Sequence, residues 1–580
     1  MKLTNNYLPG KASNERPWLR YYPDEMKNMK IPDCTLNAYL RTRACGGDAV
    51  AIHYYGTDIT WAQLFAMVNQ TACALRAIGV GENTQLPVLL RSVPEFIVLL
   101  LAVEQVGAAV LCRDNTVEEN AEAIARSGAH VMVIHDFLSQ EELDAYTAAG
   151  IERLITVSPY RMAKSESMPD YVKSVIERCY PAQPVQDDRL IDWDAFITMG
   201  DGFQGEVKVA EDYDRPLLRV YTSGSTGPSK QVIHSARTII SVTHQYCFYA
   251  DGMLFRPTWL LTILPPSLVA VVITMLLMPL ASNKILILDP FLEVEDLDLE
   301  IMRYRPNFWP HIPMFIETLM RSKRIPEDYD ISHLLATGSG CEAVNNVQLE
   351  NIKEFLGKHN YKAPYTLSYG QSEAGSGCVM PVFDVPVKDG CVGIPTPLNT
   401  MGVFKAGTEE EMGYEEIGEL CVSGPGLMLG YGEDVASDAS TLIEHSDGMK
   451  WLHTGDQGYI DQRGCVYVLG RGAKNRYGGG VLLEVALENK VSDARIPGVV
   501  DAFFVVAPDE EHEGYFLPYL YVVLQDGAKM EDVRTAVDRV LEENERPVEI
   551  LQVPERPFFH FKTARVEKVQ ELRKRAGKSK

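Results

Sequence analysis

Helical and strand-like hydrophobic patterns alternate along the first half of the chain. Thr60 and Gln63 have the spacing of a capping box, and the apolar residues after them recur every three or four positions, which predicts a helix that ends at Gly79. Residues 93–106 predict a second helix. Short apolar runs that predict strands lie at 86–90, 108–112, 131–134 and 154–157. Because strands alternate with helices, we expect a mostly parallel sheet whose faces are covered by helices.

The pattern changes twice further along. Residues 158–215 are polar and irregular, which predicts a connecting surface region, and strand-like runs resume at 217–221 and 285–288. Beyond residue 470, β-type runs and one helical pattern predict a separate small α+β unit. These runs lie at 503–506, 519–524 and 548–553, with the helical pattern at 530–544. We therefore predict a large α/β domain over 1–470 and a small α+β domain over 471–580, with a basic end that frays in solvent.

Composition narrows the function classes. The chain has 580 residues, too many for one compact core. Its 55 Lys and Arg against 79 Asp and Glu give a net charge of −24, which argues against a general binder of nucleic acids or anionic membranes. The longest nearly unbroken apolar run, 268–281, is shorter than the roughly 20 residues that span a bilayer, so we expect a buried segment and no transmembrane helix. The start has no hydrophobic signal region, and the 11 cysteines include no Cys-x-x-Cys pair, so we expect a cytoplasmic protein with reduced thiols.

Residues 221–230 have the composition of a phosphate-binding loop. They read Tyr-Thr-Ser-Gly-Ser-Thr-Gly-Pro-Ser-Lys and follow a predicted strand. Glycines let the backbone approach an anion, hydroxyls add donors, and Lys230 adds a positive charge. A flexible Ser/Gly linker is the alternative, but a linker needs no lysine and seldom follows a buried strand directly. The loop is not a Walker A motif, because Ser229 precedes the lysine and Gln231 follows it.

Four further motifs follow this loop in order. Residues 339–344 read Ser-Gly-Cys-Glu-Ala-Val, residues 369–373 read Tyr-Gly-Gln-Ser-Glu, residues 418–420 read Gly-Glu-Leu, and residues 454–456 read Thr-Gly-Asp. Gly430-Tyr431 and Gly470-Arg471 lie at matching spacings. Together with the loop, these motifs resemble the signature of the adenylate-forming superfamily, which contains acyl-CoA synthetases, adenylation domains of peptide synthetases and luciferases. The resemblance covers roughly residues 45–570.

The resemblance implies a reaction that joins a carboxylate to the α-phosphate of ATP and expels pyrophosphate. It implies that Lys230 and Glu373 are catalytic, that Glu373 binds Mg²⁺, that Tyr369 offers a flat face to adenine, and that Asp456 accepts hydrogen bonds from the ribose hydroxyls. The implied nucleotide-binding residues are Thr222, Ser223, Gly224, Ser225, Thr226, Gly227, Lys230, Ser339, Gly340, Cys341, Glu342, Tyr369, Gly370, Ser372, Asp456 and Arg471. Taken singly, these side chains could also be surface acids, core tyrosines, turn caps or surface ion pairs.

Two departures from the family pattern lie near the C-terminus. The family hinge residue falls on Ala473, with Lys474 next and three glycines at 478–480, so the pivot between domains could behave differently. The lysine motif Thr-x-x-Gly-Lys is loose, because residues 562–569 read Lys-Thr-Ala-Arg-Val-Glu-Lys-Val. By resemblance, Lys568 is the best candidate for the catalytic lysine of adenylation and Lys562 is the second. A solvated helix start is the alternative for this charged stretch.

A third departure bears on the substrate. Residues 264–268 read Leu-Pro-Pro-Ser-Leu, and Leu268 takes the place of a family histidine. Amino-acid-activating domains carry an aspartate here that pairs with the substrate's amino group. Because no acid is present, a cationic substrate end would be buried unpaired, which favours an apolar acid. The apolar residues that follow, 269–275, are either core or the lining of an acid pocket.

The sequence therefore favours an AMP-forming acid:CoA ligase that activates an apolar carboxylic acid, fatty or aryl, as an acyl-adenylate. Its expected cofactors and partners are ATP, Mg²⁺, CoA and the small-molecule acid. The segment 16–23, Arg-Pro-Trp-Leu-Arg-Tyr-Tyr-Pro, resembles the opening of fatty-acyl-CoA synthetases and favours CoA as the acceptor. Two alternatives stay open: a stand-alone ligase that loads an acyl carrier protein, and a nucleotide-binding relative that has lost turnover.

Overall fold

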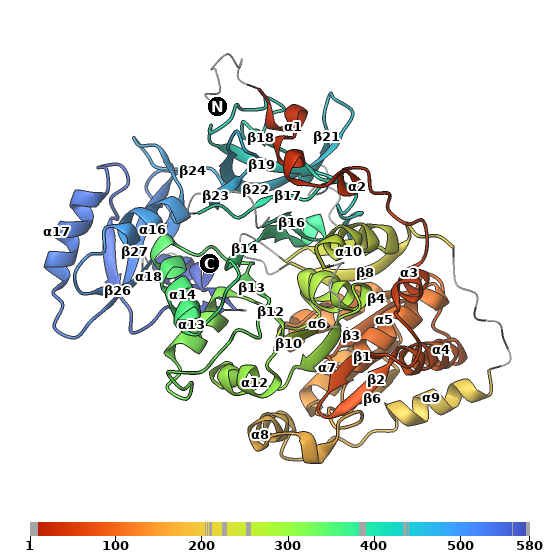
Figure 1. The fold of residues 1–580 in the computed structure, drawn as a ribbon. Helices are drawn as coiled ribbons and strands as arrows, with labels where there is room; N and C mark the ends of the chain where they lie inside the picture. Colours follow the sequence, from red (N-terminus) through yellow and green to blue (C-terminus); the bar gives the residue numbers. More distant parts are fainter. Residues whose placement is uncertain are drawn as a thin grey trace.

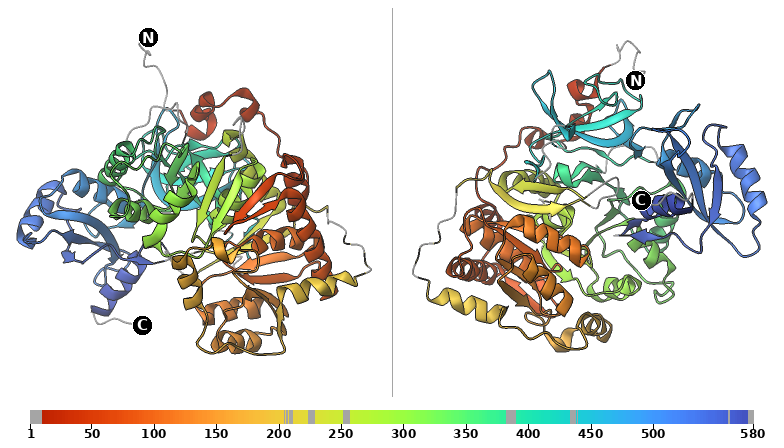
Figure 2. Two further views of the ribbon diagram at one scale, coloured as in Figure 1. Left: turned by 60° about the horizontal axis from the view of Figure 1, so that its bottom comes forward. Right: turned by 180° about the vertical axis from the view of Figure 1, so that it is seen from behind.

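A computed structural model describes residues 10–203, 205, 207, 211–222, 229–250, 257–381, 390–432, 438, 440–559 and 561–575. Two large, mostly parallel sheets form the centre of the N-terminal region, and helices pack on them (Figure 1). An antiparallel sheet follows, and a small C-terminal region of mixed sheet and helices lies beside it, as the second pair of views also shows (Figure 2). The fold is of the α/β class that the sequence predicts. Within the described residues, no helix is both long and apolar enough to cross a membrane.

The first large sheet contains the predicted strands of the first half. Its strand order is β20-β9-β8-β4-β3-β5-β6-β7, parallel from β8 to β7, while β9 and β20 run antiparallel. The strands are β3 (Gln85–Leu89), β4 (Ala109–Cys112), β5 (Val131–His135), β6 (Arg153–Val157), β7 (Leu190–Asp192), β8 (Pro216–Tyr221), β9 (Gln231–Ser235) and β20 (Gly430–Tyr431). The β8–β9 pair frames the predicted phosphate loop.

The second large sheet has the order β14-β13-β12-β10-β11-β1-β2 and is parallel except at β2. Its strands are β1 (Val50–Tyr54), β2 (Thr57–Thr60), β10 (Thr258–Thr262), β11 (Ile285–Asp289), β12 (Phe308–His311), β13 (Ala336–Ser339) and β14 (Thr366–Leu367). Its neighbouring helices include α10 (Ala236–Ala250), α12 (Leu297–Tyr304), α13 (Pro313–Arg321) and α14 (Asn346–Lys358). The carboxyl end of β13 carries the second predicted nucleotide motif.

Both predicted helices of the first half are present. Thr60 and Gln63 form the predicted capping box, and α4 (Trp61–Ala77) follows it. Every residue of α5 (Pro94–Val106) is buried, which explains its nearly continuous apolar sequence. The apolar run 268–281 is likewise buried, as a π-helix over Val271–Leu277 that continues into α11 (Met278–Ala281).

The prediction of an irregular connection over residues 158–215 is wrong. This stretch contains α8 (Asp170–Cys179), β7 and α9 (Trp193–Asp201). In α8, three apolar side chains at helical spacing are buried, Val172, Val175 and Ile176. The polar majority around this narrow stripe conceals it in the sequence, because most of the helix surface faces solvent.

The C-terminal part of the described chain contains two larger sheets, besides two strand pairs, β24 (Lys474–Asn475) with β25 (Val481–Leu482) and β29 (Phe558–Phe559) with β30 (Lys562–Thr563). The antiparallel sheet contains β18 (Thr400–Phe404), β19 (Gly418–Ser423), β21 (Leu442–Glu444), β22 (Lys450–Ile460) and β23 (Val466–Arg471). The last sheet contains β26 (Val499–Pro508), β27 (Phe516–Leu524) and β28 (Glu549–Gln552), flanked by α16 (Glu484–Asp493), α17 (Met530–Val540) and α18 (Arg565–Arg575). The predicted runs at 503–506, 519–524 and 548–553 and the helix near 530 all lie in these elements.

Two observations concern the small region as a unit. The large core cluster ends at Tyr467 among its buried members, and a separate cluster begins at Leu482, while the division at residue 471 stays a prediction. Residues 572–575 of the basic end are helical and not frayed, because Leu572 is buried in α18 against Phe503 of β26, while residues 576–580 lie outside the described residues. A single apolar residue among charged neighbours gives too weak a pattern to predict this docking.

Candidate active site

Two hydrogen bonds join the two ends of the phosphate loop. Thr222 N–H donates to the Lys230 carbonyl at 2.9 Å, and Lys230 N–H donates to Thr222 Oγ1 at 3.0 Å. The two ends of the loop therefore lie side by side on the β8–β9 hairpin. The other predicted loop residues, Ser223, Gly224, Ser225, Thr226 and Gly227, lie outside the described residues.

Lys230 and Glu373 both contact Tyr431. The Nζ atom of Lys230 lies 4.8 Å from the ring centroid of Tyr431, and the Tyr431 hydroxyl donates to Glu373 Oε1 at 2.8 Å. Burial, together with the Glu373 carboxylate, raises the pKa of Tyr431, so its phenol stays protonated and donates. The structure thus brings together the predicted phosphate lysine and the predicted magnesium ligand.

A histidine that the sequence analysis does not identify joins these two motifs. His234 of β9 is fully buried, and its Nε2 atom lies 2.8 Å from the carbonyl oxygen of Ser372. Burial lowers the pKa of His234 to about 4, so the ring is neutral near pH 7 and its Nε2–H donates to that carbonyl. This bond ties the strand after the phosphate loop to the turn that carries Glu373. A lone histidine in an apolar strand gives no sequence signal for this role.

Asp456 has two partners within the site. Tyr369 donates its hydroxyl to Asp456 Oδ2 at 2.7 Å, and Arg471 Nη1 lies 3.2 Å from Oδ1. Asp456 and Arg471 are direct neighbours across β22 and β23. Burial raises the pKa of Asp456, and this rise is opposed by the charge of Arg471, the Tyr369 hydroxyl and the charge of Lys562. Three predicted site residues therefore meet at one carboxylate.

Gly370 follows Tyr369 on a tightly packed strand, β15 (Tyr369–Gln371), which pairs with β16 (Ser376–Met380), and Ser372 begins the 3-10 turn Ser372–Ala374 that comes next. A Cβ atom at Gly370 would lie 1.9 Å from the carbonyl oxygen of Ser376, so only glycine fits at this position. The close approach of the two strands holds Tyr369 and the Ser372–Glu373 turn at fixed places.

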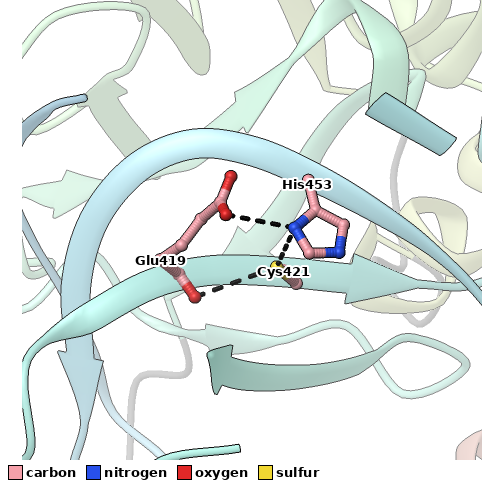
Figure 3. Close-up of side chains that lie close together, drawn as sticks. All are labelled: Glu419, Cys421 and His453. Carbon is pink, nitrogen blue, oxygen red and sulfur yellow. Dashed lines mark hydrogen bonds and ion pairs between the residues drawn. The ribbon is translucent and has the colours of Figure 1, made fainter. Parts of the chain in front are cut away.

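A cluster on β19 and β22 supports the turn before Asp456 (Figure 3). Glu419 Oε1 accepts from Gly455 N–H at 3.0 Å, and Glu419 Oε2 lies 3.0 Å from His453 Nδ1. Cys421 Sγ lies 3.5 Å from the same nitrogen. The three ligand atoms lie within 4.8 Å of one another, close enough to share a cation. Their contacts already account for the cluster as a brace for Gly455, whose φ of 73° suits glycine.

The motif at 339–342 lies at the end of β13, and its residues have different environments: Ser339 is buried, whereas Glu342 contacts the C-terminal region. Ser339 is buried, and a Cβ atom at Gly340 would lie 2.6 Å from Ser368 Oγ. Cys341 is exposed and adopts a left-handed φ of 71°. Glu342 points to the C-terminal region, where its Oε1 accepts from Thr563 N–H at 2.9 Å and lies 3.3 Å from Arg565 Nη1.

The two candidate lysines lie in different places. Lys568 is in α18, where its Nζ atom lies 2.8 Å from Glu571 Oε2 and 5.7 Å from the Tyr521 ring centroid. Lys562 lies in β30 (Lys562–Thr563), and its charge lowers the pKa of both Asp456 and Cys341, so it is within electrostatic reach of the site. The first-ranked lysine of the sequence analysis therefore contacts Glu571 and Tyr521, whereas the charge of the second-ranked one acts on Asp456.

Comparison with known proteins identifies the family. A model of the AMP-binding enzyme family matches residues 41–432. Among curated proteins, 4-coumarate–CoA ligase 2 of Oryza sativa subsp. japonica is 24% identical over 432 residues, covering 72% of this chain and 70% of that protein. The long-chain-fatty-acid–CoA ligase of Bacillus subtilis (strain 168) is 23% identical over 472 residues, covering 79% of this chain and 80% of that protein.

Solved structures share the fold. ATP-bound MatB from Rhodopseudomonas palustris aligns with a TM-score of 0.77 and 21% identity, covering 94% of this chain and 99% of that one. O-succinylbenzoate coenzyme A synthetase from Bacillus subtilis, in complex with ATP and magnesium, aligns with a TM-score of 0.67 and 20% identity, covering 90% of this chain and 96% of that one. With the family model spanning well over half of its length, the chain belongs to the AMP-binding enzyme family, the adenylate-forming enzymes that its motifs resemble.

Proposed function

We propose that the protein is an AMP-forming acid–CoA ligase. It activates an apolar carboxylic acid, fatty or aryl, as an acyl-adenylate and then transfers the acyl group to the thiol of CoA. The observation that carries the proposal is the convergence of Tyr369 and Arg471 on Asp456, together with the Lys230–Tyr431–Glu373 group, while Lys562 lies within electrostatic reach of Asp456. The relatives named as CoA ligases favour CoA as the acceptor over a carrier protein.

The chain's own residues suit the first half-reaction. A carboxylate oxygen attacks the α-phosphorus of ATP, and the bond to pyrophosphate breaks. Two anions must meet in this step, so the charges of Lys230 and Lys562 lower the repulsion between them. Asp456 accepts hydrogen bonds from the ribose hydroxyls, and the Tyr369 ring covers the adenine. In the second half-reaction the CoA thiolate attacks the acyl carbonyl, and AMP leaves.

Glu373 fits the role of a magnesium ligand. Its carboxylate is buried, one oxygen accepts from Tyr431, and within the described residues no donor reaches the other oxygen. A hard cation such as Mg²⁺ would bind this second carboxylate oxygen together with phosphate oxygens. When bound, it would neutralise part of the phosphate charge.

The buried segment after β10 supports an apolar acid. Residues 264–275 contain no acidic side chain, and Val269, Val271 and Val272 are at most 1% exposed. These valines are core residues, so the segment offers an ammonium group no partner, and burying one there would be costly. An amino-acid substrate is therefore disfavoured.

Acid-dependent exchange of labelled pyrophosphate into ATP tests the proposal. The acids are a panel of aliphatic, aromatic and bile acids, and the matched variants are Lys562→Ala and Lys568→Ala. We expect exchange with one acid class, a loss of about 100-fold or more in Lys562→Ala because a charge at the reacting phosphate is removed, and little change in Lys568→Ala.

Two outcomes would contradict this assignment. Loss of exchange in Lys568→Ala alone would return the catalytic role to that residue. ATP binding without exchange for any acid would favour a nucleotide-binding relative that lacks turnover. Thioester formation with CoA, compared with a phosphopantetheinylated carrier protein, then separates the two acceptors.

A further inference from the structure

The carboxylate of Glu342 connects the two regions of the chain. It belongs to the loop between β13 and α14, yet its contacts are with residues more than 200 positions away. Oε1 accepts from Thr563 N–H at 2.9 Å and lies 3.3 Å from Arg565 Nη1, with the Glu342 side chain only 10% exposed. A charge-assisted contact of this kind, shielded from water, is stronger than an exposed ion pair.

The same contact fixes the segment that carries Lys562. Thr563 is held from both sides, because Arg556 Nη1 lies 3.3 Å from its Oγ1 atom while Glu342 accepts from its N–H. On the other side of Lys562, the ring of Phe561 packs edge-on against Phe315, with centroids 5.9 Å apart. Lys562 is thus set between two anchored neighbours.

The charges around Arg565 make this contact easy to release. Arg565 Nη2 also lies 2.8 Å from Glu488 Oε1, and its Nε donates to the Phe504 carbonyl at 3.2 Å. Glu488 and Phe504 belong to the C-terminal region itself. If that region moves away, Arg565 keeps Glu488 as its counter-ion and Glu342 becomes hydrated, so neither charge is left buried and unpaired.

We propose that Glu342 is a reversible latch for the first half-reaction. It is a positioning residue that holds Thr563, and through it Lys562, against the nucleotide site during adenylation. This contact breaks when the C-terminal region moves away before the thiol attacks. This inference rests on the proposed function, because it assigns one arrangement of the same enzyme to one half-reaction.

The test compares Glu342→Gln and Glu342→Ala with Glu350→Gln in the full-length protein. Glu350 pairs with Arg495 across the same interface, but both side chains are more than half exposed, so this matched variant should change little. The first readout is pyrophosphate exchange with the acid that the wild type activates. The second is thioester formation from CoA and the separately supplied acyl-adenylate. Thermal unfolding reports whether each variant is folded.

For Glu342→Gln we expect exchange at saturating ATP to fall about 10-fold, with KM for ATP unchanged, since the variant loses the charge that pairs with Arg565 and keeps an acceptor for Thr563. Glu342→Ala, which also loses the acceptor for Thr563, should fall further. Thioester formation from supplied acyl-adenylate should stay at the wild-type rate or rise in both variants.

Other results would overturn the latch. A raised KM for ATP with unchanged kcat would make Glu342 a nucleotide contact. An equal loss in both half-reactions, or a loss that follows the unfolding midpoint, would make its role structural. Wild-type exchange with unaffected Glu342 variants would remove the latch and leave the proposed function intact. A wild type that exchanges with no acid would overturn the proposed function and the latch together.

Discussion

Tyr369 has two separate roles in the site, one for its ring and one for its hydroxyl. Its ring lies where the adenine is proposed to stack, and its hydroxyl donates to Asp456 Oδ2 at 2.7 Å. That bond favours the ionised carboxylate, against burial, which raises the pKa of Asp456. The ionised carboxylate accepts from the ribose hydroxyls more strongly than the protonated group does, so the hydroxyl of Tyr369 extends strong ribose binding to lower pH.

Tyr369→Phe should therefore shift the pH profile. Removing the donor raises the pKa of Asp456 further, so a larger share of the protein carries a protonated carboxyl group, which is a weaker acceptor, as the pH falls. We expect the acidic limb of kcat/KM for ATP, measured by pyrophosphate exchange, to move to higher pH.

The control is Tyr414→Phe, whose hydroxyl donates to Glu15 at 2.8 Å, away from Asp456. An unchanged acidic limb in Tyr369→Phe would mean that Asp456 does not govern it.

At the scale of secondary-structure elements, β15 leaves no space for a side chain at Gly370. A Cβ atom at Gly370 would meet the Ser376 carbonyl oxygen at 1.9 Å and the Gly377 Cα at 2.5 Å, and both are backbone atoms. No side-chain rotation can relieve such a clash. The strand pair β15–β16 must separate, and Tyr369 and Glu373 would move with it.

We expect Gly370→Ala to lower stability by roughly 1–3 kcal/mol through overpacking and to abolish exchange. Gly448→Ala is the control for the steric effect, because nothing lies within 4 Å of its Cβ although its φ of 76° is left-handed. That variant should lose about 1 kcal/mol and keep its activity. Thermal unfolding and exchange measure both, and equal effects of the two changes would refute the steric argument.

Local patterns predicted much of the architecture. The capping box at Thr60, the alternation of strands and helices, and the strand before the phosphate loop all depend on near neighbours, and they are present. The sequence pattern did not predict α8, because the apolar stripe of this helix is narrow. The choice between Lys562 and Lys568 stays a prediction, because a linear motif does not say which way α18 faces. The partner of Glu342 lies 221 residues away, and no spacing rule reaches that far.

The molecule as a whole has two sets of hydrophobic clusters joined by a mostly polar contact. Among the described residues, those buried up to Tyr467 form one large cluster and two smaller ones, and those from Leu482 onward form two clusters of their own. The adenine, ribose and phosphate contacts that we propose all lie before residue 472, whereas Lys562 lies after it. Binding and catalysis should therefore be separable by cutting the chain between the two.

A protein of residues 1–471 should fold, bind ATP and show no exchange. It keeps its own core and the proposed nucleotide contacts but lacks Lys562. A single thermal transition and calorimetric ATP binding check the first two expectations. Full-length Lys562→Ala is the reference, and its kinetic defect should match. Aggregation of the shortened protein, or loss of ATP binding, would show that the C-terminal region is needed for more than catalysis.

The polar character of the contact between the regions has a thermal consequence. Its hydrogen bonds and ion pairs join Asn345 to Ser492, Asn346 to Asp493 and Glu342 to Arg565, and the aromatic pair of Phe315 and Phe561 adds a small apolar area. Exposure of apolar surface raises the heat capacity and exposure of polar surface lowers it, so the two contributions largely cancel when the contact opens. The enthalpy of opening then varies little with temperature, and the balance between the two arrangements should follow a straight van 't Hoff line over the range in which the protein stays folded.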